Sequence, residues 1–174
     1  MESVVFKGRG WRNRWPLIAL LAVLTAAALL VRYLEKGGVR DVEGHATTID
    51  GDSLYVGGRE VRLSGIDAPE GEQVCRRGGA KWECGEAATQ ELSQMIDGQL
   101  LRCQGLDIDQ HGRLLALCRA SEIDLNREMV RRGLAVAFGR YAEEEREAAN
   151  ANRGLWGGEF ERPRDWRRER GISN

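Results

Sequence analysis

Two short apolar runs surround the pair Gly57-Gly58, and their spacing constrains the fold more than any other feature of the chain. Apolar and polar residues alternate on both sides of the pair, which is the period of a β-strand with one buried face. Glycine readily adopts the positive φ angles of a tight turn, so the pair indicates a β-hairpin. The apolar positions of the two expected strands are Leu54, Val56, Val61 and Leu63.

The chain beyond this hairpin continues with a mixture of strands and helices. Further strands are expected at residues 100–104, 114–118 and 135–138. Apolar residues at helical spacing predict helices over residues 86–96, 124–132 and 142–153, each followed by a glycine. Because the strands come first and the helices are inserted late, the pattern predicts an α+β domain built on a small antiparallel barrel or curled sheet.

Composition and charge restrict the class of protein and its partners. The chain has 174 residues, of which 42% are hydrophobic and 30% charged, as in a globular protein rather than a disordered one. Its formal net charge is -1, so no overall field attracts nucleic acid, and a polyanion must be bound by a local cluster of arginines. We expect one domain with short appendages that acts as a monomer.

An apolar segment near the N-terminus indicates export. Residues 16–33 follow a basic tail at residues 1–15 and are apolar for most of their length. A bilayer-spanning helix needs about 17–25 residues, so this segment is at the short end unless Trp15 and Tyr33 lie in the two interfaces. We expect one transmembrane helix that anchors the chain in a lipid bilayer, followed by a linker at residues 34–42.

The orientation and processing of this segment leave two outcomes. The basic tail carries slightly more Lys and Arg than the residues after the run, which favours a single-pass protein with an exported periplasmic or extracellular domain. The alternative is a cleaved signal peptide and a secreted protein, because Ala26-Ala27-Ala28 offers a small-residue cleavage site. The apolar run continues to Val31, which a cleaved signal does not need, so the uncleaved anchor is favoured.

The four cysteines support an oxidising compartment. They contain no C-x-x-C pair and have no nearby set of histidines, so two disulfides are favoured over a zinc site. The remaining alternative is four reduced, partly buried thiols in a cytosolic protein.

The pairing of the cysteines follows from an expected hairpin. If Gln110-His111 is its two-residue loop, counting outward without a bulge places Cys103 opposite Cys118. Directly opposed residues of antiparallel strands lie within disulfide range. By elimination, Cys75 pairs with Cys84 and closes the loop between them.

Two acidic clusters border the first hairpin. Asp50 and Asp52 precede it, and Asp67 and Glu70 follow it. On a strand, Asp50 and Asp52 point the same way, and the hairpin then brings both clusters to one end of the sheet. Gathered carboxylates repel each other unless a cation neutralises them, and oxygen ligands without His or Cys favour calcium or magnesium. The alternative is a set of solvated turn acids, since Asp-Gly and residue-Pro pairs are typical of turns.

Two arginines add the chemistry of phosphate binding to these acids. Arg62 lies on the polar face of the hairpin, five residues before Asp67, and Arg113 follows the loop of the second hairpin. Guanidinium groups and a metal ion neutralise charge on a phosphate, and a carboxylate orients or deprotonates water. A lone arginine on a polar strand face is usually only solvated, but the combination indicates phosphodiester cleavage.

Several motifs, taken in order, resemble the thermonuclease family, the staphylococcal-nuclease-like domains. They are IDGDS, VRLSGIDAPE, DQHGR, LNREMVRRGLAVAF and GLW, and they cover about residues 43–157. The resemblance implies a domain at residues 43–160 with a five-stranded antiparallel OB-fold β-barrel and three helices. It also implies a calcium-dependent nuclease that hydrolyses DNA, RNA or both and leaves 3′-phosphate ends.

The resemblance also implies a calcium site. Asp52 and Asp67 match the family's calcium carboxylates, and Asp50 matches an outer acidic residue of the metal site. The backbone carbonyl of Ala68 matches a further ligand. The family usually has Thr at this last position, and a ligand that acts through its backbone tolerates the change.

The catalytic residues implied by the resemblance number three. Arg62 and Arg113 match the family's phosphate-binding arginines. Glu70 matches its general base or water-orienting carboxylate.

The C-terminal residues 161–174 form an Arg-rich tail. With Trp156 and Trp166, this tail is expected either to follow a nucleic-acid backbone with aromatic stacking, or to be solvated while Trp156 fills the core. The alternative to an enzyme is a non-catalytic OB-fold module that binds nucleic acid or protein. Such a module does not need two metal carboxylates, a base and two arginines, so the nuclease is favoured.

Overall fold

The computed structural model of the chain describes residues 15–36 and 41–172. The chain divides after Gly38 into two compact units, and each is described separately. Residues 1–14 of the expected basic tail and residues 37–40 of the expected linker lie outside the described residues.

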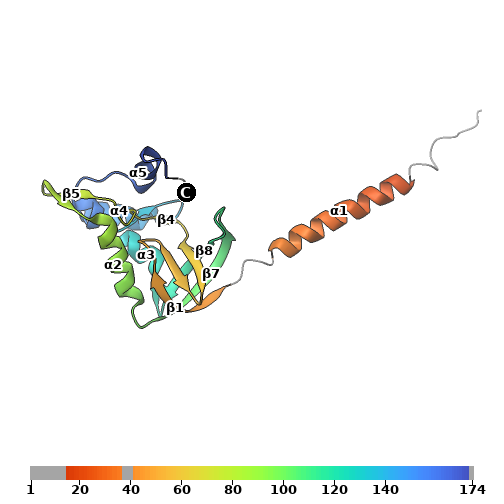
Figure 1. Cartoon of the computed structure of the whole chain (residues 1–174), viewed down its shortest axis with the longest axis horizontal. Helices are drawn as coiled ribbons and strands as arrows, with labels where there is room; N and C mark the ends of the chain where they lie inside the picture. The colour runs from red at the N-terminus through yellow and green to blue at the C-terminus, as the bar shows by residue number, and fades with distance from the viewer. Residues whose placement is uncertain (1–14, 37–40, 173–174) are drawn as a thin grey trace, which may run out of the picture. The chain divides into compact units, whose positions relative to one another are not determined.

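The described part of the first unit is helix α1, over Trp15–Lys36 (Figure 1). It begins at the start of the expected apolar segment and extends beyond its expected end at residue 33, because Leu and Ala, which favour helices, dominate the sequence. The sequence predicted a transmembrane helix here. Among the described residues, however, no helix has the length and apolarity that crossing a membrane requires.

A closed β-barrel forms the centre of the second unit (Figure 1). Its strands lie in the order β3-β2-β1-β7-β8, and pairing of β3 with β8 closes the ring. The strands are β1 (Val42–Thr48), β2 (Ser53–Val56), β3 (Arg59–Leu63), β7 (Leu100–Ile108) and β8 (Leu114–Ala120). The five-stranded barrel expected from the sequence is therefore confirmed.

The pairing of β3 with β8 is parallel, whereas the sequence predicted an antiparallel barrel. The other four pairings of the ring are antiparallel. In a closed ring with an odd number of strands, directions cannot alternate at every step, so at least one neighbouring pair must be parallel. This pairing places Arg62 of β3 beside Leu115 of β8, close to the hairpin that carries Arg113.

Short strands extend or flank the barrel. β9 (Ile123–Asp124) continues the sheet beside β8, and β4 (Ile66–Asp67) pairs with β10 (Val136–Ala137), the strand expected at residues 135–138. A separate hairpin joins β5 (Cys75–Arg77) to β6 (Ala80–Trp82). The pairing of β4 matters most for function, because it fixes the position of Asp67.

The three expected helices of the domain are present as α2 (Cys84–Ile96), α3 (Leu125–Arg131) and α4 (Ala142–Asn150). The buried side chains of α2 and α3 belong to the barrel core, which includes Leu54, Leu63, Leu101 and Leu114, whereas α4 packs against α3, β10 and the turn after it. Two further elements follow, a 3₁₀ turn η1 (Gly154–Gly157) and helix α5 (Pro163–Glu169). The sequence did not predict α5.

Helix α5 corrects one of the two alternatives for the C-terminal residues, that of a solvated tail. Pro163 stands in its first turn, where proline is favoured because its ring presets the helical φ angle. Trp166 and Arg167 are buried, with 6% and 4% of their surface exposed. The sequence pattern did not indicate this helix, because most of its residues are charged and only one face of its two turns is buried.

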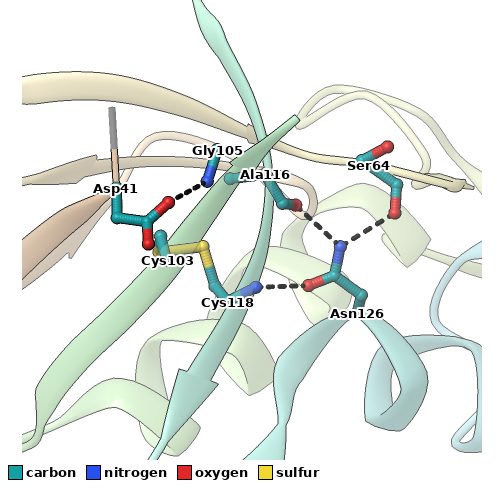
Figure 2. The surroundings of a disulfide bond; sticks show 7 residues. All are labelled: Asp41, Ser64, Cys103, Gly105, Ala116, Cys118 and Asn126. Atoms are coloured by element: carbon teal, nitrogen blue, oxygen red, sulfur yellow. Dashed lines mark hydrogen bonds between the residues drawn. A yellow bond between two sulfur atoms is a disulfide. The ribbon is translucent and has the colours of Figure 1, made fainter. Parts of the chain in front are cut away.

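Two disulfides join the predicted cysteine pairs, Cys75 with Cys84 and Cys103 with Cys118. Figure 2 shows the second of these between β7 and β8. The expected two-residue loop was wrong, because the backbone N–H of Asp109 pairs with the carbonyl of Arg113. A bulge between Gly105 and Asp107 shifts the register back by one residue. The two irregularities cancel, so the predicted cysteine pair still faces across the hairpin.

Asn126 of α3 ties this helix to the barrel beside the disulfide (Figure 2). Its side chain accepts a hydrogen bond from the Cys118 N–H and donates to the carbonyls of Ser64 and Ala116. A buried amide with all these partners satisfied is stable and orients what it contacts. Through Ser64, it supports the segment between β3 and β4 that leads to Asp67.

Candidate active site

The turn between β1 and β2 places Asp52 at one end of the barrel. Asp50 and Asp52 both lie in this turn rather than on a strand, so the expectation that their side chains share a strand face was wrong. The Asp52 N–H donates to Asp50 Oδ1 over 2.9 Å, which assigns Asp50 to the shape of the turn. A Cβ on Gly51 would lie 2.7 Å from Cβ of Ala68, so only glycine allows the turn to approach that residue.

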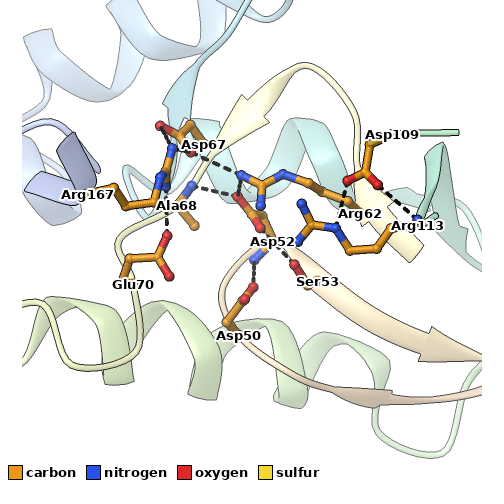
Figure 3. A network of polar contacts seen from close by, with 10 residues as sticks. All are labelled: Asp50, Asp52, Ser53, Arg62, Asp67, Ala68, Glu70, Asp109, Arg113 and Arg167. Carbon is orange, nitrogen blue, oxygen red and sulfur yellow. Dashed lines mark hydrogen bonds and ion pairs between the residues drawn. The ribbon is translucent and has the colours of Figure 1, made fainter. Parts of the chain in front are cut away.

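Arg62 joins the two acidic clusters that the sequence placed around the hairpin (Figure 3). Its Nη2 donates to Asp52 Oδ2 over 3.1 Å and to Asp67 Oδ1 over 3.2 Å. The β2–β3 register sets Ser53 opposite Arg62, and Asp67 sits on β4 five residues later. The hairpin therefore brings both aspartates to the guanidinium, as the sequence suggested.

Asp52 is buried, with 3% of its surface exposed, and both of its carboxylate oxygens accept hydrogen bonds. Its Oδ2 also accepts from the Ala68 N–H over 3.1 Å, and its Oδ1 accepts from the Ser53 hydroxyl over 3.0 Å. Burial raises the pKa of Asp52 to about 7, and the opposing effect of Arg62 is smaller. Additional positive charge at this carboxylate would stabilise its ionised form.

Arg113 reaches the same region from the β7–β8 hairpin (Figure 3). Asp109 holds it by accepting a 2.7 Å hydrogen bond from Nε and a 2.9 Å bond from the Arg113 backbone N–H. The Asp109 carboxylate also accepts from the His111 N–H and so shapes the turn. Sequence reasoning missed Asp109, although an aspartate at the start of a turn is a known signal for such bonds.

Arg113, Arg62 and Asp67 line one cavity of about 680 Å³. Arg113 therefore faces the same cavity as Asp67 and Arg62, as a candidate catalytic site requires. The exposed Phe138 and two further arginines, Arg140 and Arg164, line the same cavity. The cavity combines positive charge with an aromatic face.

Arg167 of α5 also lines this cavity, and sequence reasoning missed it (Figure 3). Its Nη2 lies 2.9 and 3.2 Å from the two carboxylate oxygens of Asp67, and its Nη1 lies 2.7 Å from Glu70 Oε1. Burial lowers the pKa of Arg167, but the hydrogen bonds and charges of Glu70 and Asp67 outweigh it and raise the pKa above its usual range. Glu70 is thus linked to Asp67 through a guanidinium.

Comparison with known proteins gives these residues a family. The family described as "Staphylococcal nuclease homologue" matches residues 60–157. The chain belongs to the staphylococcal nuclease homologue family. Arg62, Asp67, Glu70 and Arg113 lie inside the matched residues, whereas Asp52 precedes them and Arg167 follows them.

Relatives of this nuclease homologue carry different names. It is 33% identical over 138 residues to "Succinoglycan biosynthesis protein ExoI" of Rhizobium meliloti (strain 1021), and the aligned residues make up 75% of this chain and 72% of the relative. It is 28% identical over 169 residues to "Uncharacterized endonuclease" of Haemophilus influenzae, which covers 90% and 86%. It is 34% identical over 116 residues to "Probable staphylococcal-like nuclease CAN2" of Oryza sativa subsp. japonica, which covers 63% of this chain and only 29% of the rice protein.

The donor chemistry of this nuclease homologue's site suits calcium, but the arrangement does not leave the donors free. Carboxylate oxygens of Asp52 and Asp67, with a backbone carbonyl at Ala68, are the hard ligands that calcium prefers. Both oxygens of Asp67 and one oxygen of Glu70 are engaged by guanidinium groups. Within the described residues, no three Asp, Glu, His or Cys side chains form a group that could hold a metal ion.

Proposed function

We propose that the protein is a calcium-dependent nuclease that hydrolyses phosphodiester bonds of DNA, RNA or both. The observation that carries this proposal is the convergence of Arg62, Arg113 and Asp67 on one cavity. Two guanidinium groups beside carboxylates match the charge of a phosphate that is being attacked by water. The family to which the chain belongs, and the relatives named as nucleases, support the same activity.

Each residue has a proposed task. Arg62 and Arg113 bind the non-bridging phosphate oxygens, and Asp109 holds Arg113 ready by its 2.7 Å bond to Nε. Glu70, whose side chain is 28% exposed, orients a water molecule and accepts its proton. The water oxygen forms a bond to phosphorus as the bond to the 5′ oxygen breaks. The departing 5′ oxygen takes up a proton from solvent water, which leaves a 5′-hydroxyl and a 3′-phosphate.

Asp52, Asp67 and the Ala68 carbonyl are the proposed ligands of calcium. When bound, the ion supplies positive charge to the phosphate and to the buried carboxylates. Asp50 supports this site through the turn that it closes. We propose that the protein acts as a monomer.

We further propose that the nuclease domain is exported. The two disulfides support this location, because such bonds persist in oxidising compartments. Helix α1 is the proposed export segment, and its sequence leaves both retention in a bilayer and cleavage as outcomes. Cell fractionation separates them: retention places the intact chain with the membrane, whereas cleavage releases a protein shortened at its N-terminus.

Digestion of single- and double-stranded DNA and RNA by the purified full chain tests the proposed activity. Cleavage should need calcium, stop when a chelator is added, and fall strongly in Glu70→Gln. Glu72→Gln is the matched control, because Glu72 is exposed and lies two residues away. Equal cleavage with and without chelator would contradict calcium dependence.

One observation favours a non-catalytic binding module instead, because Arg167 engages the two carboxylates that catalysis requires. Such a module binds nucleic acid without cutting it under any calcium concentration. The digestion experiment distinguishes the two functions when binding is measured in parallel on the same oligonucleotides.

A further inference from the structure

Helix α5 brings a positive charge into the candidate metal site from outside the family match. The match ends at residue 157, whereas α5 spans Pro163–Glu169. The Arg167 side chain is only 4% exposed, so it is part of the site rather than a solvated tail. Arg167 thus lies outside the matched residues, as Asp52 does at their other end.

Burial of Trp166 and a hydrogen bond to the preceding segment hold α5 in place. Trp166 is buried beside it, and the side chain of Arg170 lies over the Trp166 ring at 4.2 Å. Gln73, three residues after Glu70, donates from Nε2 to the Glu161 carbonyl over 2.7 Å. The segment before α5 is therefore bound to the same loop that carries Glu70.

The guanidinium of Arg167 occupies the carboxylates that a metal ion would use. It contacts both oxygens of Asp67, and Arg62 contacts one of the same oxygens. It also contacts Glu70, the proposed base. A divalent ion bound to Asp67 would face this buried cation across a few ångströms, where like charges repel strongly because water is largely excluded.

The docked arrangement is not fully satisfied. Nε of Arg167 is buried and has no hydrogen-bond partner among the described residues. An unpaired buried donor costs free energy, which lowers the cost of releasing the side chain. The carboxylates of Asp67 and Glu70 therefore favour a nearby positive charge. The Arg167 guanidinium supplies this charge, but leaves one of its own N–H groups unpaired.

We propose that Arg167 is a tethered competitor of the divalent ion: α5 docked and metal bound are mutually exclusive states of one site. This inference rests on the proposed calcium-dependent function. In the docked state, the guanidinium neutralises Asp67 and Glu70 and keeps both from metal and water. In the metal-bound state, the ion takes over Asp67, Arg167 leaves, and Glu70 is free to orient water.

Calcium titration of the full chain by calorimetry tests the competition. Arg167→Gln should bind calcium about tenfold or more tightly than the wild type. Arg167→Lys, which keeps the charge, should restore weaker binding. Arg168→Gln is the matched control: it removes one charge from the same helix, but the Arg168 side chain is 73% exposed and forms its ion pair with Asp165 of the same helix. Its calcium affinity should stay within twofold of the wild type.

Hydrogen exchange of the wild-type chain tests the same claim without a variant. Calcium should accelerate exchange in the peptide that contains residues 163–170, because binding undocks α5. Equal affinities of wild type and Arg167→Gln, or slower exchange of this peptide with calcium, would overturn the competition. Cleavage that still required calcium in that case would leave the nuclease proposal standing, whereas absence of calcium binding in every variant would overturn both.

Discussion

Arg113 and Arg167 enter the same cavity, yet different groups hold them. Arg113 is held by Asp109, a residue of its own hairpin. Arg167 is held by Asp67 and Glu70, carboxylates of the candidate active site. Arg113 is anchored outside the reacting groups and is ready to bind a phosphate, whereas Arg167 is anchored on both Asp67 and Glu70 and neutralises them. The partners of these two arginines, more than their shared cavity, distinguish their proposed roles.

The largest expected effect is the loss of Arg113. Arg113→Ala should lower kcat about 100- to 1,000-fold, because it removes one preorganised donor to the transition state. Its calcium affinity should not change, since Arg113 contacts none of the proposed ligands. Steady-state digestion and calorimetry measure the two quantities. A decrease in kcat of less than about tenfold would show that Arg113 lacks the phosphate-binding role that distinguishes it from Arg167.

Removal of Arg167 should act on stability rather than on catalysis at saturating calcium. Without calcium, Arg167→Gln should lower the free energy of unfolding by about 3 kcal/mol, because the buried negative charge of Asp67 loses one of its two positive partners. Calcium should recover most of this loss. Urea denaturation with chelator and with calcium measures both values. A variant as stable as the wild type in chelator would contradict the strong pairing of Arg167.

The Cys103–Cys118 disulfide should stabilise the hairpin that carries Arg113. The bond closes a segment of 15 residues, for which chain entropy gives about 3 kcal/mol. Replacing both cysteines by serine should lower stability by about 2–3 kcal/mol, without changing the effect of Arg167→Gln on calcium binding. Urea denaturation of the cysteine-to-serine variant measures the stability. Calcium titration of this variant with and without Arg167→Gln measures the effect on calcium binding. Strong coupling between the two changes would contradict the separation of the two regions.

Asp109→Asn gives the smallest effect and a distinct pH dependence. Burial raises the pKa of Asp109, but hydrogen bonds from Arg113 and His111 outweigh it and hold the pKa below its ordinary 3.8. Its stabilisation is therefore complete above the unfolded pKa and disappears as pH falls through the lower folded pKa. The variant should be less stable by about 1–2 kcal/mol at pH 7, and the difference should shrink in acid.

Denaturation of Asp109→Asn and wild type at several pH values measures that difference. Exposed Asp107→Asn on the same hairpin provides the control. A difference that grows as pH falls would contradict the sign of the pKa shift.

The sequence predicted the parts of the site that depend on local spacing. The pair Gly57-Gly58 defines the hairpin, and the hairpin sets Arg62 opposite Ser53, next to Asp52. Cys103 and Cys118 were also paired correctly, but only because the longer turn and the bulge offset each other. Counting residues outward from a turn predicts which residues face each other across a hairpin only when bulges and longer turns are absent or offset each other.

The sequence could not predict contacts that depend on the turn geometry or on distant docking. Asp50 was placed on a strand, whereas its carboxylate closes an Asp turn. Arg167 lies 100 residues from Asp67 in the sequence, in a short helix that is mostly charged. No periodicity marks such a residue as buried, because its burial is compensated by acids that fold next to it.

The most direct test of the account is the rate of DNA and RNA digestion as a function of calcium, in wild type and Arg167→Gln. Both proteins should be inactive in chelator. The variant should reach half of its maximal rate at about tenfold lower calcium, with a similar maximum, if Arg167 competes for the metal site. Cleavage that persists in chelator, or no cleavage by either protein at any calcium concentration, would contradict the assignment of this site as a calcium-dependent nuclease.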